Sequence, residues 1–317
     1  MITGIIAGVA WALETVFLGI ALGTTPFITT AQAIVLAPFV ATFFHDFVSA
    51  AFMWLYNTVK GNLKNLIGVF KNSCLKWLVL ASAIGGPIGM TGYVMAVNYM
   101  GASVGAVASA IYPAIGTVLS YIFLKEEVKW YQWIFLTLTL LGVYGLSYSP
   151  GLDMENFWLG LLGAMMCAFG WGIEAVILAK CFKDSTVKNE YALCIRQTVS
   201  AVIYAAVIIP ILGGWGFTVS LFAMGSGKTF FVITVAALCA TISYLFYYHT
   251  IAKLGAAKAM SLNITYTAWA IVFTVVILQD FSVLNPLTLI CGGIVVLCGI
   301  FAATDLKKLF HSRSRLK

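Results

Sequence analysis

The chain carries very little charge for its length. Of its 317 residues only 9% are Asp, Glu, Lys or Arg, whereas 62% are hydrophobic. Soluble domains carry about 25% charged residues, so this composition excludes an ordinary soluble domain and indicates a polytopic membrane protein. The net charge of +7 reflects basic residues on the cytoplasmic side of the membrane, so we expect no nucleic-acid partner.

Metal-ligand and disulfide patterns are missing from the sequence. The seven cysteines stand singly in or near apolar segments, without a CxxC pair or a Cys/His pair, and only three histidines are present. Such cysteines are typical small buried hydrophobic residues, so we expect no metal and no cofactor. The sequence also shows no nucleophile or metal cluster that a membrane-embedded enzyme acting on lipid would need. We therefore expect a protein without enzymatic activity.

An N-terminal basic region is missing as well. The chain begins Met1-Ile2-Thr3, and the apolar segment that follows is long enough to cross a bilayer. We therefore expect this segment to be the first transmembrane helix rather than a removable signal peptide.

Long apolar segments account for most of the chain. About 20 apolar residues cross the roughly 30 Å hydrocarbon core as a helix, so 317 residues can supply about ten spans. We predict an all-α polytopic membrane protein with ten helices. They lie at 2–23, 27–56, 77–100, 103–124, 130–148, 156–180, 190–210, 229–252, 256–278 and 286–304.

Basic residues set the expected orientation. If the N-terminus is cytoplasmic, every Lys and Arg except Lys228 falls on or near the cytoplasmic side of this ten-helix arrangement. The positive-inside rule then places both termini in the cytoplasm, and it accounts for the net positive charge. Residues 57–76 mix lysines with large apolar residues, which indicates a short amphipathic piece lying on the membrane surface.

The sequence contains internal matches between its two halves. Trp11-Ala-Leu-Glu14 returns as Trp171-Gly-Ile-Glu174, 160 residues later. At an offset of 154, Tyr112 aligns with Tyr266, and the acid that follows each of these helices also aligns, Glu126 with Asp280. Chance similarity among apolar segments is the alternative for any single match.

These matches predict two repeats of five helices each. Because five is odd, the second copy must enter the membrane upside down, which is the inverted-repeat plan of secondary transporters. We place the first repeat at 1–150, the second at 151–305 and a basic cytoplasmic tail at 306–317.

Two acids fall within the apolar segments. A carboxylate at the membrane centre costs about 2.5–3.5 kcal/mol on insertion scales, so Glu14 and Glu174 are expected to face a cavity. The alternative is a protonated glutamate buried between helices, or a pair with Arg196. Trp11 and Trp171 each lie three residues before one of these acids and hence on the same helix face.

A second set of ionisable residues lies at similar depth in two other segments. His45-Asp46 falls in the second segment and Arg196 in the seventh. An Asp46–Arg196 ion pair is the simplest way to tolerate both residues in a membrane, and a gate that opens and closes is the alternative. His45 could relay protons or serve as a structural hydrogen-bond donor. Gly85-Gly86-Pro87 is expected to break the third helix.

Several strings resemble one family closely. His45-Asp46-Phe47, Gly86-Pro87-Ile88-Gly89-Met90, the run from Ser109 to Ile115, Ile195-Arg196-Gln197 and Ile242-Ser243-Tyr244-Leu245 are similar to the bacterial choline importers of the LicB type. These importers belong to the drug/metabolite transporter (EamA-type) superfamily, whose two five-helix halves the predicted architecture also resembles. The resemblance runs from the first helix to the tenth.

The resemblance implies uptake of choline, or a related quaternary ammonium cation, across a bacterial cytoplasmic membrane, linked to protons or driven by membrane potential. It implies an aromatic box for the cation, made of Trp11, Tyr112, Trp171, Glu174, Tyr244, Tyr247, Tyr266 and Trp269. Glu14, His45, Asp46 and Arg196 are the candidates for coupling or gating. Glu14 departs from the family pattern, which leaves open another organic cation or a proton-binding role. The alternative function is an exporter of amino acids, metabolites or drugs.

Overall fold

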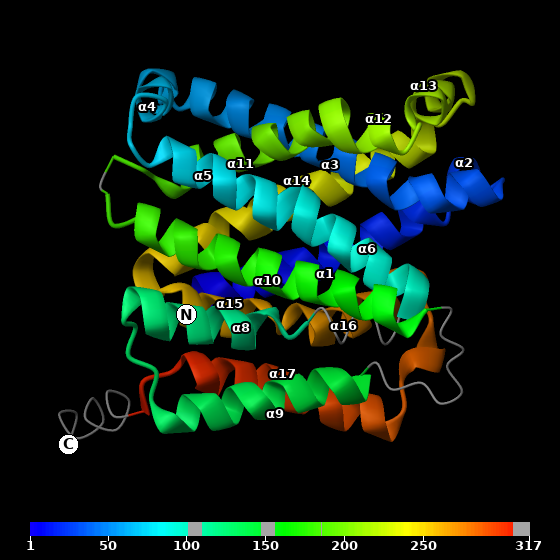
Figure 1. Cartoon of the computed structure of the whole chain (residues 1–317). Helices are drawn as coiled ribbons and strands as arrows, with labels where there is room; N and C mark the ends of the chain where they lie inside the picture. The colour runs from blue at the N-terminus through cyan, green and yellow to red at the C-terminus, as the bar shows by residue number, and fades with distance from the viewer. Residues whose placement is uncertain (101–109, 147–155, 185, 307–317) are drawn as a thin grey trace.

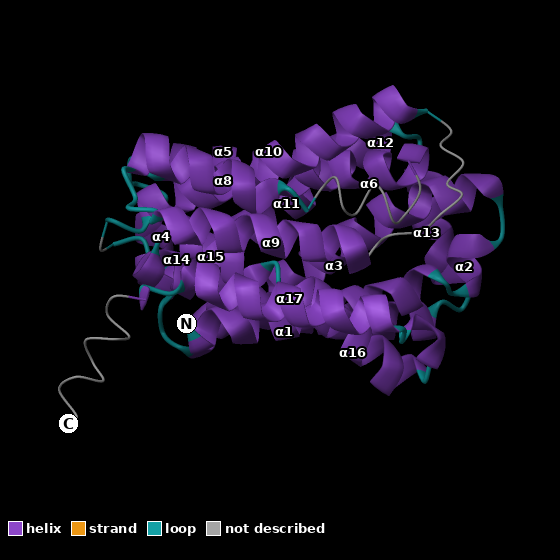
Figure 2. Ribbon diagram, turned by 90° about the horizontal axis from the view of Figure 1, so that it is seen from below, coloured by secondary structure: helices purple, strands orange, loops and turns teal. Residues whose placement is uncertain are grey.

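Every regular element in the described part of the chain is a helix (Figure 1, Figure 2). The computed structural model describes residues 1–100, 110–146, 156–184 and 186–306. The longer helices are α1 (Ile2–Leu22), α3 (Ala31–Val59), α6 (Gly89–Met100), α9 (Trp130–Leu146), α10 (Phe157–Cys181), α11 (Asn189–Ile203), α14 (Gly227–Leu254), α16 (Tyr266–Leu278) and α17 (Pro286–Ala303). The shorter helices are α2 (Thr25–Ile28), α4 (Leu63–Val69), α5 (Leu75–Ala83), α8 (Tyr112–Leu119), α12 (Ile209–Ile211), α13 (Trp215–Ala223) and α15 (Ala256–Asn263).

The helices confirm a polytopic membrane protein. Within the described residues, eight helical segments are long and apolar enough to cross a membrane. Two shorter apolar helices, Tyr112–Leu124 and Trp130–Leu146, lie where the fourth and fifth spans are predicted. Residues 101–109, ahead of the first of these, and 147–155, after the second, lie outside the described ranges, so the count of ten spans stays a prediction.

Some boundaries differ from the sequence prediction for local reasons. The second span begins at Ala31 rather than at residue 27, because Thr30 caps it by accepting a hydrogen bond from the backbone N–H of Ala33 at 3.0 Å. The helix α13 was not predicted. Within 57–76 the helix α4 buries Leu66 and Val69 in the protein core, so this amphipathic piece packs on the bundle.

The ninth predicted helix is two helices in the structure. It divides after Asn263, where α15 ends, and α16 begins at Tyr266. The hydroxyl of Thr265 donates to the carbonyl of Leu262 at 2.6 Å, which closes the turn between the two pieces. Discontinuous helices of this kind place irregular backbone inside transporters, where it can line a cavity.

The expected break at Gly85-Gly86-Pro87 is a π-helical turn instead. This turn, η1 (Ile84–Ile88), continues from α5 into α6 without interrupting the helix. Proline lacks the N–H that an α-helical ladder needs, and a wider π turn tolerates its absence while redirecting nearby carbonyls. A redirected carbonyl from this turn contributes to the site described below.

The helices pack as a layered bundle (Figure 1, Figure 2). The helix α10 packs against α6 and α8, α1 packs against α14 and α16, and α9 pairs with α17. The contact between α6 and α10 is backbone to backbone, since a Cβ on Gly92 would lie only 2.5 Å from the carbonyl oxygen of Gly163. Small residues permit this approach, which gives membrane helices their packing energy.

The N-terminus and the last described residues lie at the same end of the bundle as α4 (Figure 1). The hydroxyl of Thr304 is 3.8 Å from the sulfur of Met1. This arrangement supports placing Met1 and the end of α17 on one side of the membrane. Which side that is stays a prediction.

One pair of backbone features supports the predicted repeat. Lys125 and Gln279 are the two non-glycine residues with positive φ in the described chain, at 55° and 56°. Each ends the helix that begins at Tyr112 or at Tyr266, and they lie 154 residues apart, the offset found in the sequence. The inverted relation and the boundary near residue 150 stay predictions, because 147–155 and the tail from 307 lie outside the described residues.

Candidate substrate site

Seven of the eight predicted cation-site residues line one cavity. Side chains from α1, α8, α10, α14 and α16 meet there, so segments far apart in the sequence build a single site. The lining consists of Trp11, Tyr112, Trp171, Glu174, Tyr244, Tyr247 and Tyr266, together with Ala175, Ser243 and Asn263. The cavity has about 40 Å³ of accessible volume, enough for a few water molecules.

The rings contact one another edge to face. The centroid of Trp11 lies 5.0 Å from Tyr244 and 6.4 Å from Tyr266, at interplanar angles of 79° and 76°. Trp171 lies 5.4 Å from Tyr112 at 87°. Edge-to-face pairs leave ring faces directed to several sides, and the electron-rich face is the part of a ring that attracts a cation.

Trp171 is held in place by the π turn. Its indole N–H donates to the carbonyl oxygen of Gly85 at 3.0 Å. A side chain at residue 85 could not be accommodated, since a Cβ there would lie 1.9 Å from Oε2 of Glu174. The glycine and the π turn therefore bring the backbone of this helix directly against both Trp171 and Glu174.

Glu174 is paired in the structure. Its Oε1 accepts hydrogen bonds from Nε of Arg196 at 3.3 Å and from the hydroxyl of Tyr248 at 2.9 Å. The guanidinium of Arg196 also lies 4.7 Å from the ring centroid of Tyr244. Arg196 thus contacts both a carboxylate and a ring of the aromatic cavity.

The four coupling or gating candidates form one buried network of ionisable side chains that leads away from the cavity. Arg196 lies 3.6 Å from Oδ2 of Asp46, and Oδ1 of Asp46 is 2.9 Å from Nδ1 of His45. Nε2 of His45 is in turn 3.7 Å from Oε1 of Glu14. Each of these residues is no more than 7% exposed. The structure therefore connects Glu14 to Glu174 through His45, Asp46 and Arg196.

This buried network contains more acidic than basic side chains. Three carboxylates, Glu14, Asp46 and Glu174, surround one arginine and one histidine. Buried charges in a membrane need partners, and an uncompensated acid is stabilised by a proton or by a bound cation. The site is therefore suited chemically to receive a cation, a proton or both. Within the described ranges, no group of three or more His, Cys, Asp or Glu is arranged to hold a metal ion.

Trp269 lies apart from the cavity. It lines a groove between α16 and α17 with aliphatic side chains such as Val272 and Val296, and its indole nitrogen has no hydrogen-bond partner among the described residues. Its role in binding stays a prediction without support from this geometry. It lies one turn beyond Tyr266, and helical spacing by itself did not decide which of the two faces the cavity.

Three polar residues of the site were not among the predicted site residues. Tyr248 bonds to Glu174, Ser243 donates to the backbone of α1, and Asn263 donates from Nδ2 to the hydroxyl of Tyr112 at 3.1 Å. The position of Asn263 at the end of a helix could be found only once the break at 264–265 was known.

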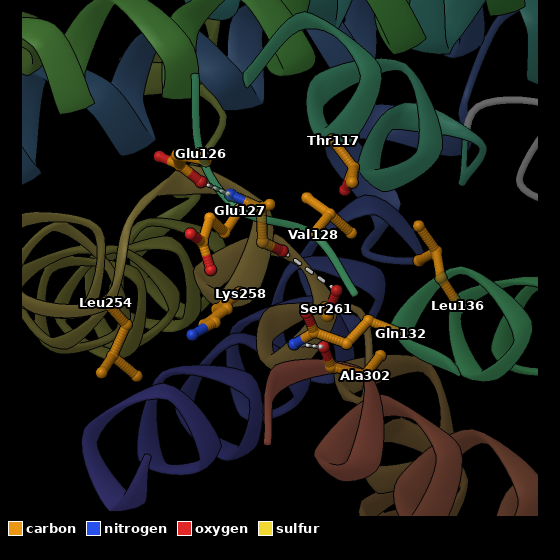
Figure 3. A pocket seen from close by; sticks show the side chains of 11 residues that line it. Thr117, Glu126, Glu127, Val128, Gln132, Leu136, Leu254, Lys258, Ser261 and Ala302 are labelled. Atoms are coloured by element: carbon orange, nitrogen blue, oxygen red, sulfur yellow. Dashed lines mark hydrogen bonds between the residues drawn. The ribbon is translucent and has the colours of Figure 1, made fainter. Parts of the chain in front are cut away.

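A second cavity, of about 160 Å³, lies farther along α8 and α15 (Figure 3). The carboxylate of Glu126 caps α15 there, accepting from the backbone N–H groups of Ala256 at 2.9 Å and Ala257 at 3.2 Å. Gln132 binds the carbonyl of Ala302 at 2.8 Å across the same cavity. Its polar groups are thus mainly occupied in joining helices, and it lacks aromatic rings.

Comparisons with known proteins agree with this picture. Residues 1–148 match the model of the EamA-like transporter family. Protein LicB of Haemophilus influenzae is 29% identical over 192 residues, which is 61% of this chain, and the match spans 63% of the length of LicB, less than two thirds. A crystal structure of another protein covers 98% of this chain and 97% of its own, with a TM-score of 0.72 and 15% identity, which shows the fold alone. The resemblance predicted from the sequence is thereby confirmed: the chain is similar to the EamA-like transporters of the drug/metabolite transporter superfamily and to Protein LicB.

Proposed function

We propose that the protein carries choline or a related quaternary ammonium cation across a bacterial cell membrane by alternating access, in the direction of uptake. The observation that carries the proposal is the cavity that combines two indoles, four tyrosines and the carboxylate of Glu174.

The chemistry of the cavity suits a cation without N–H groups. Such a cation cannot donate conventional hydrogen bonds, so it depends on ring faces and on charge. Each aromatic face contributes up to about 2 kcal/mol to a desolvated cation. Trp11 and Trp171 approach from different helices, and Tyr244 and Tyr266 complete the sides of the site. Glu174 supplies the opposite charge.

The cavity lies between two ring pairs. Trp11 with Tyr244 and Trp171 with Tyr112 border its roughly 40 Å³ of accessible volume. In an alternating-access cycle one half of the molecule rocks against the other around a central site. Separation of α1 and α14 from α8 and α10 would widen the cavity, because its lining side chains come from both groups of helices.

Arg196 is the proposed gate. It lies between Glu174 and Asp46, 3.3 Å from one and 3.6 Å from the other, and against the ring of Tyr244. A substrate cation at Glu174 repels the guanidinium toward Asp46. Binding would then change how tightly α11, which carries Arg196, is joined to α10.

Glu14 and His45 are the proposed coupling groups. They lie at the end of the buried network that is farthest from Glu174. Oε2 of Glu14 there accepts a hydrogen bond from Thr15 at 3.3 Å. A proton taken up there would reduce the excess negative charge of the buried network. Movement of one positive charge inward also gains about 2.3 kcal/mol per 100 mV of membrane potential.

Uptake by purified protein in liposomes tests the proposal. With a potential negative inside, labelled choline should accumulate, and excess unlabelled choline should abolish the signal. Trp171→Ala should remove uptake, whereas Trp158→Ala, which alters an indole that is 75% exposed, should leave it intact. Absence of choline flux in both directions from folded wild-type protein would overturn the proposal, and net flux only out of preloaded vesicles under the same potential would indicate an exporter.

A further inference from the structure

We infer that Asn263 selects cations that carry a hydroxyl group, by accepting the hydroxyl's hydrogen bond at Oδ1. The inference rests on the proposed function and adds a selectivity residue to it. Asn263 lines the aromatic cavity at the end of α15, where the ninth predicted helix divides.

One polar atom of the Asn263 amide has a hydrogen-bond partner in the protein, and the other has none among the described residues. Nδ2 donates to the hydroxyl of Tyr112 at 3.1 Å. Oδ1 is buried and has no hydrogen-bond partner among the described residues. Buried carbonyl oxygens are nearly always paired in folded proteins, so an unpaired one in a binding cavity needs an explanation.

One oxygen of Glu174, a second candidate acceptor in the cavity, is already occupied. Oε1 of Glu174 accepts from both Arg196 and Tyr248. The hydroxyl of Ser243 donates to the carbonyl of Ala7 at 2.7 Å, which directs it toward α1. Asn263 therefore offers the cavity an uncharged amide oxygen as an acceptor, with no competing partner among the residues described.

The position of Asn263 suits a short bifunctional cation. It lies three residues before Tyr266 and contacts Tyr112, and both of these rings line the cavity that also holds Trp11, Trp171 and Glu174. A cation seated among the rings would thus have its polar arm beside the amide. A hydroxyl satisfies Oδ1, an alkyl group leaves it unpaired, and a carboxylate brings two acceptors together and is repelled.

Equilibrium binding to the purified full-length protein tests this assignment with three ligands. Choline carries the hydroxyl, ethyltrimethylammonium has the same skeleton without it, and glycine betaine carries a carboxylate. We expect choline to bind about tenfold more tightly than ethyltrimethylammonium, since a hydrogen bond to an otherwise unpaired buried acceptor is worth roughly that factor. Betaine should bind most weakly.

Substitution of Asn263 should remove this preference selectively. In Asn263→Leu the ratio of the two dissociation constants should fall to about one, with ethyltrimethylammonium still bound within about threefold of its wild-type affinity. Asn263→Asp, which retains the acceptor oxygens, should keep a preference for choline. Val176→Leu, a change on α10 outside the cavity lining, serves as a control and should keep the tenfold ratio.

The outcomes separate this inference from the proposed function. Equal binding of choline and ethyltrimethylammonium to the wild type would overturn the role of Asn263 and leave a quaternary ammonium site standing. A tenfold ratio that persists in Asn263→Leu would do the same. Failure of all three ligands to bind would overturn the proposed function itself. Because the wild-type ratio needs no variant, a poorly folding substitution does not prevent the test.

Discussion

The two Trp-x-x-Glu turns are alike in sequence and different in surroundings. Both tryptophans line the aromatic cavity, but only the second acid does. Glu174 is bound by Arg196 and Tyr248, whereas Glu14 contacts Thr15 and lies 3.7 Å from His45. Trp171 is anchored by a hydrogen bond to Gly85, while Trp11 contacts Tyr244 and Tyr266 through its ring.

The difference shows how one motif can serve two purposes in one molecule. A carboxylate beside a buried arginine has a partner that stays charged at every physiological pH. A carboxylate beside a histidine has a partner whose own charge varies near neutral pH. Glu174 therefore suits substrate binding, and Glu14 suits coupling. Substitutions in and around the two turns test this division.

Glu174→Gln should have the largest effect. Truncating one member of a buried hydrogen-bonded charge pair costs about 2–5 kcal/mol, so choline uptake should fall by roughly 100-fold and the thermal midpoint should drop. Initial rates in liposomes and a melting curve measure the two effects. Wild-type uptake by this variant would remove Glu174 from the site and abolish the distinction between the two acids.

Gly85→Ala should come next. Its Cβ would lie 1.9 Å from Oε2 and 2.8 Å from Cβ of Glu174, so the π turn or α10 must shift. Because positioning errors of about 1 Å are costly in a site of this kind, uptake should fall by at least about tenfold. Gly19→Ala is the matched control on α1, since no atom lies within 4 Å of a Cβ placed there. Equal effects of the two changes would contradict the tight packing around Glu174.

Trp171→Phe should weaken binding more than Trp11→Phe does. Both changes replace an indole by a ring with a weaker cation–π attraction. Only the first also removes the hydrogen bond to Gly85, a loss of about 0.5–1.5 kcal/mol, so its choline affinity should be about three- to tenfold lower than that of Trp11→Phe. Isothermal titration of both variants measures this. The reverse order would show that Trp11 is the principal ring.

Glu14→Gln should spare binding and alter coupling. Glu14 does not line the cavity, so uptake driven by membrane potential should stay within about threefold of the wild type. The stimulation of uptake by an imposed pH gradient should disappear, as the proton site is lost. Uptake by the variant that still responds to the pH gradient would place coupling elsewhere, with His45 the next residue to test.

Asp184→Asn should leave transport unchanged and alter only the pH dependence of stability, by a small amount. Asp184 lies between α10 and α11, where hydrogen bonds from the side chain of Asn72 and from Thr186 hold the pKa of its carboxyl below the usual range. A depressed pKa contributes stability above the pKa of the unfolded state, and this is lost as the pH falls through the folded pKa. The melting temperature of the variant should therefore depend slightly less on acid pH. A large loss of uptake would mean that this loop takes part in gating.

Much of the architecture could be predicted from the sequence because bilayer thickness fixes helix length. Apolar run lengths gave helices whose observed ends lie within a few residues of most predicted ones, and Pro286 and Gly255 lie at helix ends as expected. The start of α3 was misplaced because a threonine cap is a weak signal within an apolar stretch. The π turn at Gly85 was predicted as a break, since the same residues permit either and only packing against α10 favours one.

The site was predicted less completely than the fold. Acids and rings in hydrocarbon are costly or bulky enough to be recognised individually, and seven of those predicted lie together. Asn263 and Trp269 show the limit of this reasoning. The first joins the cavity because its helix ends there, and the second is directed to α17 by the rotation of α16, which spacing along the chain does not determine.

By itself, then, the sequence determined that the chain crosses a membrane many times. It also identified the acids and rings whose transfer into hydrocarbon costs enough free energy to require a structural or functional role. These conclusions depend only on the transfer energies of side chains and on the thickness of hydrocarbon. The tertiary structure alone decided that Arg196 pairs with both Glu174 and Asp46, and that Glu14 is joined to them through His45. Charge pairing depends on distances of a few ångströms between helices, and no pattern within a single helix encodes them.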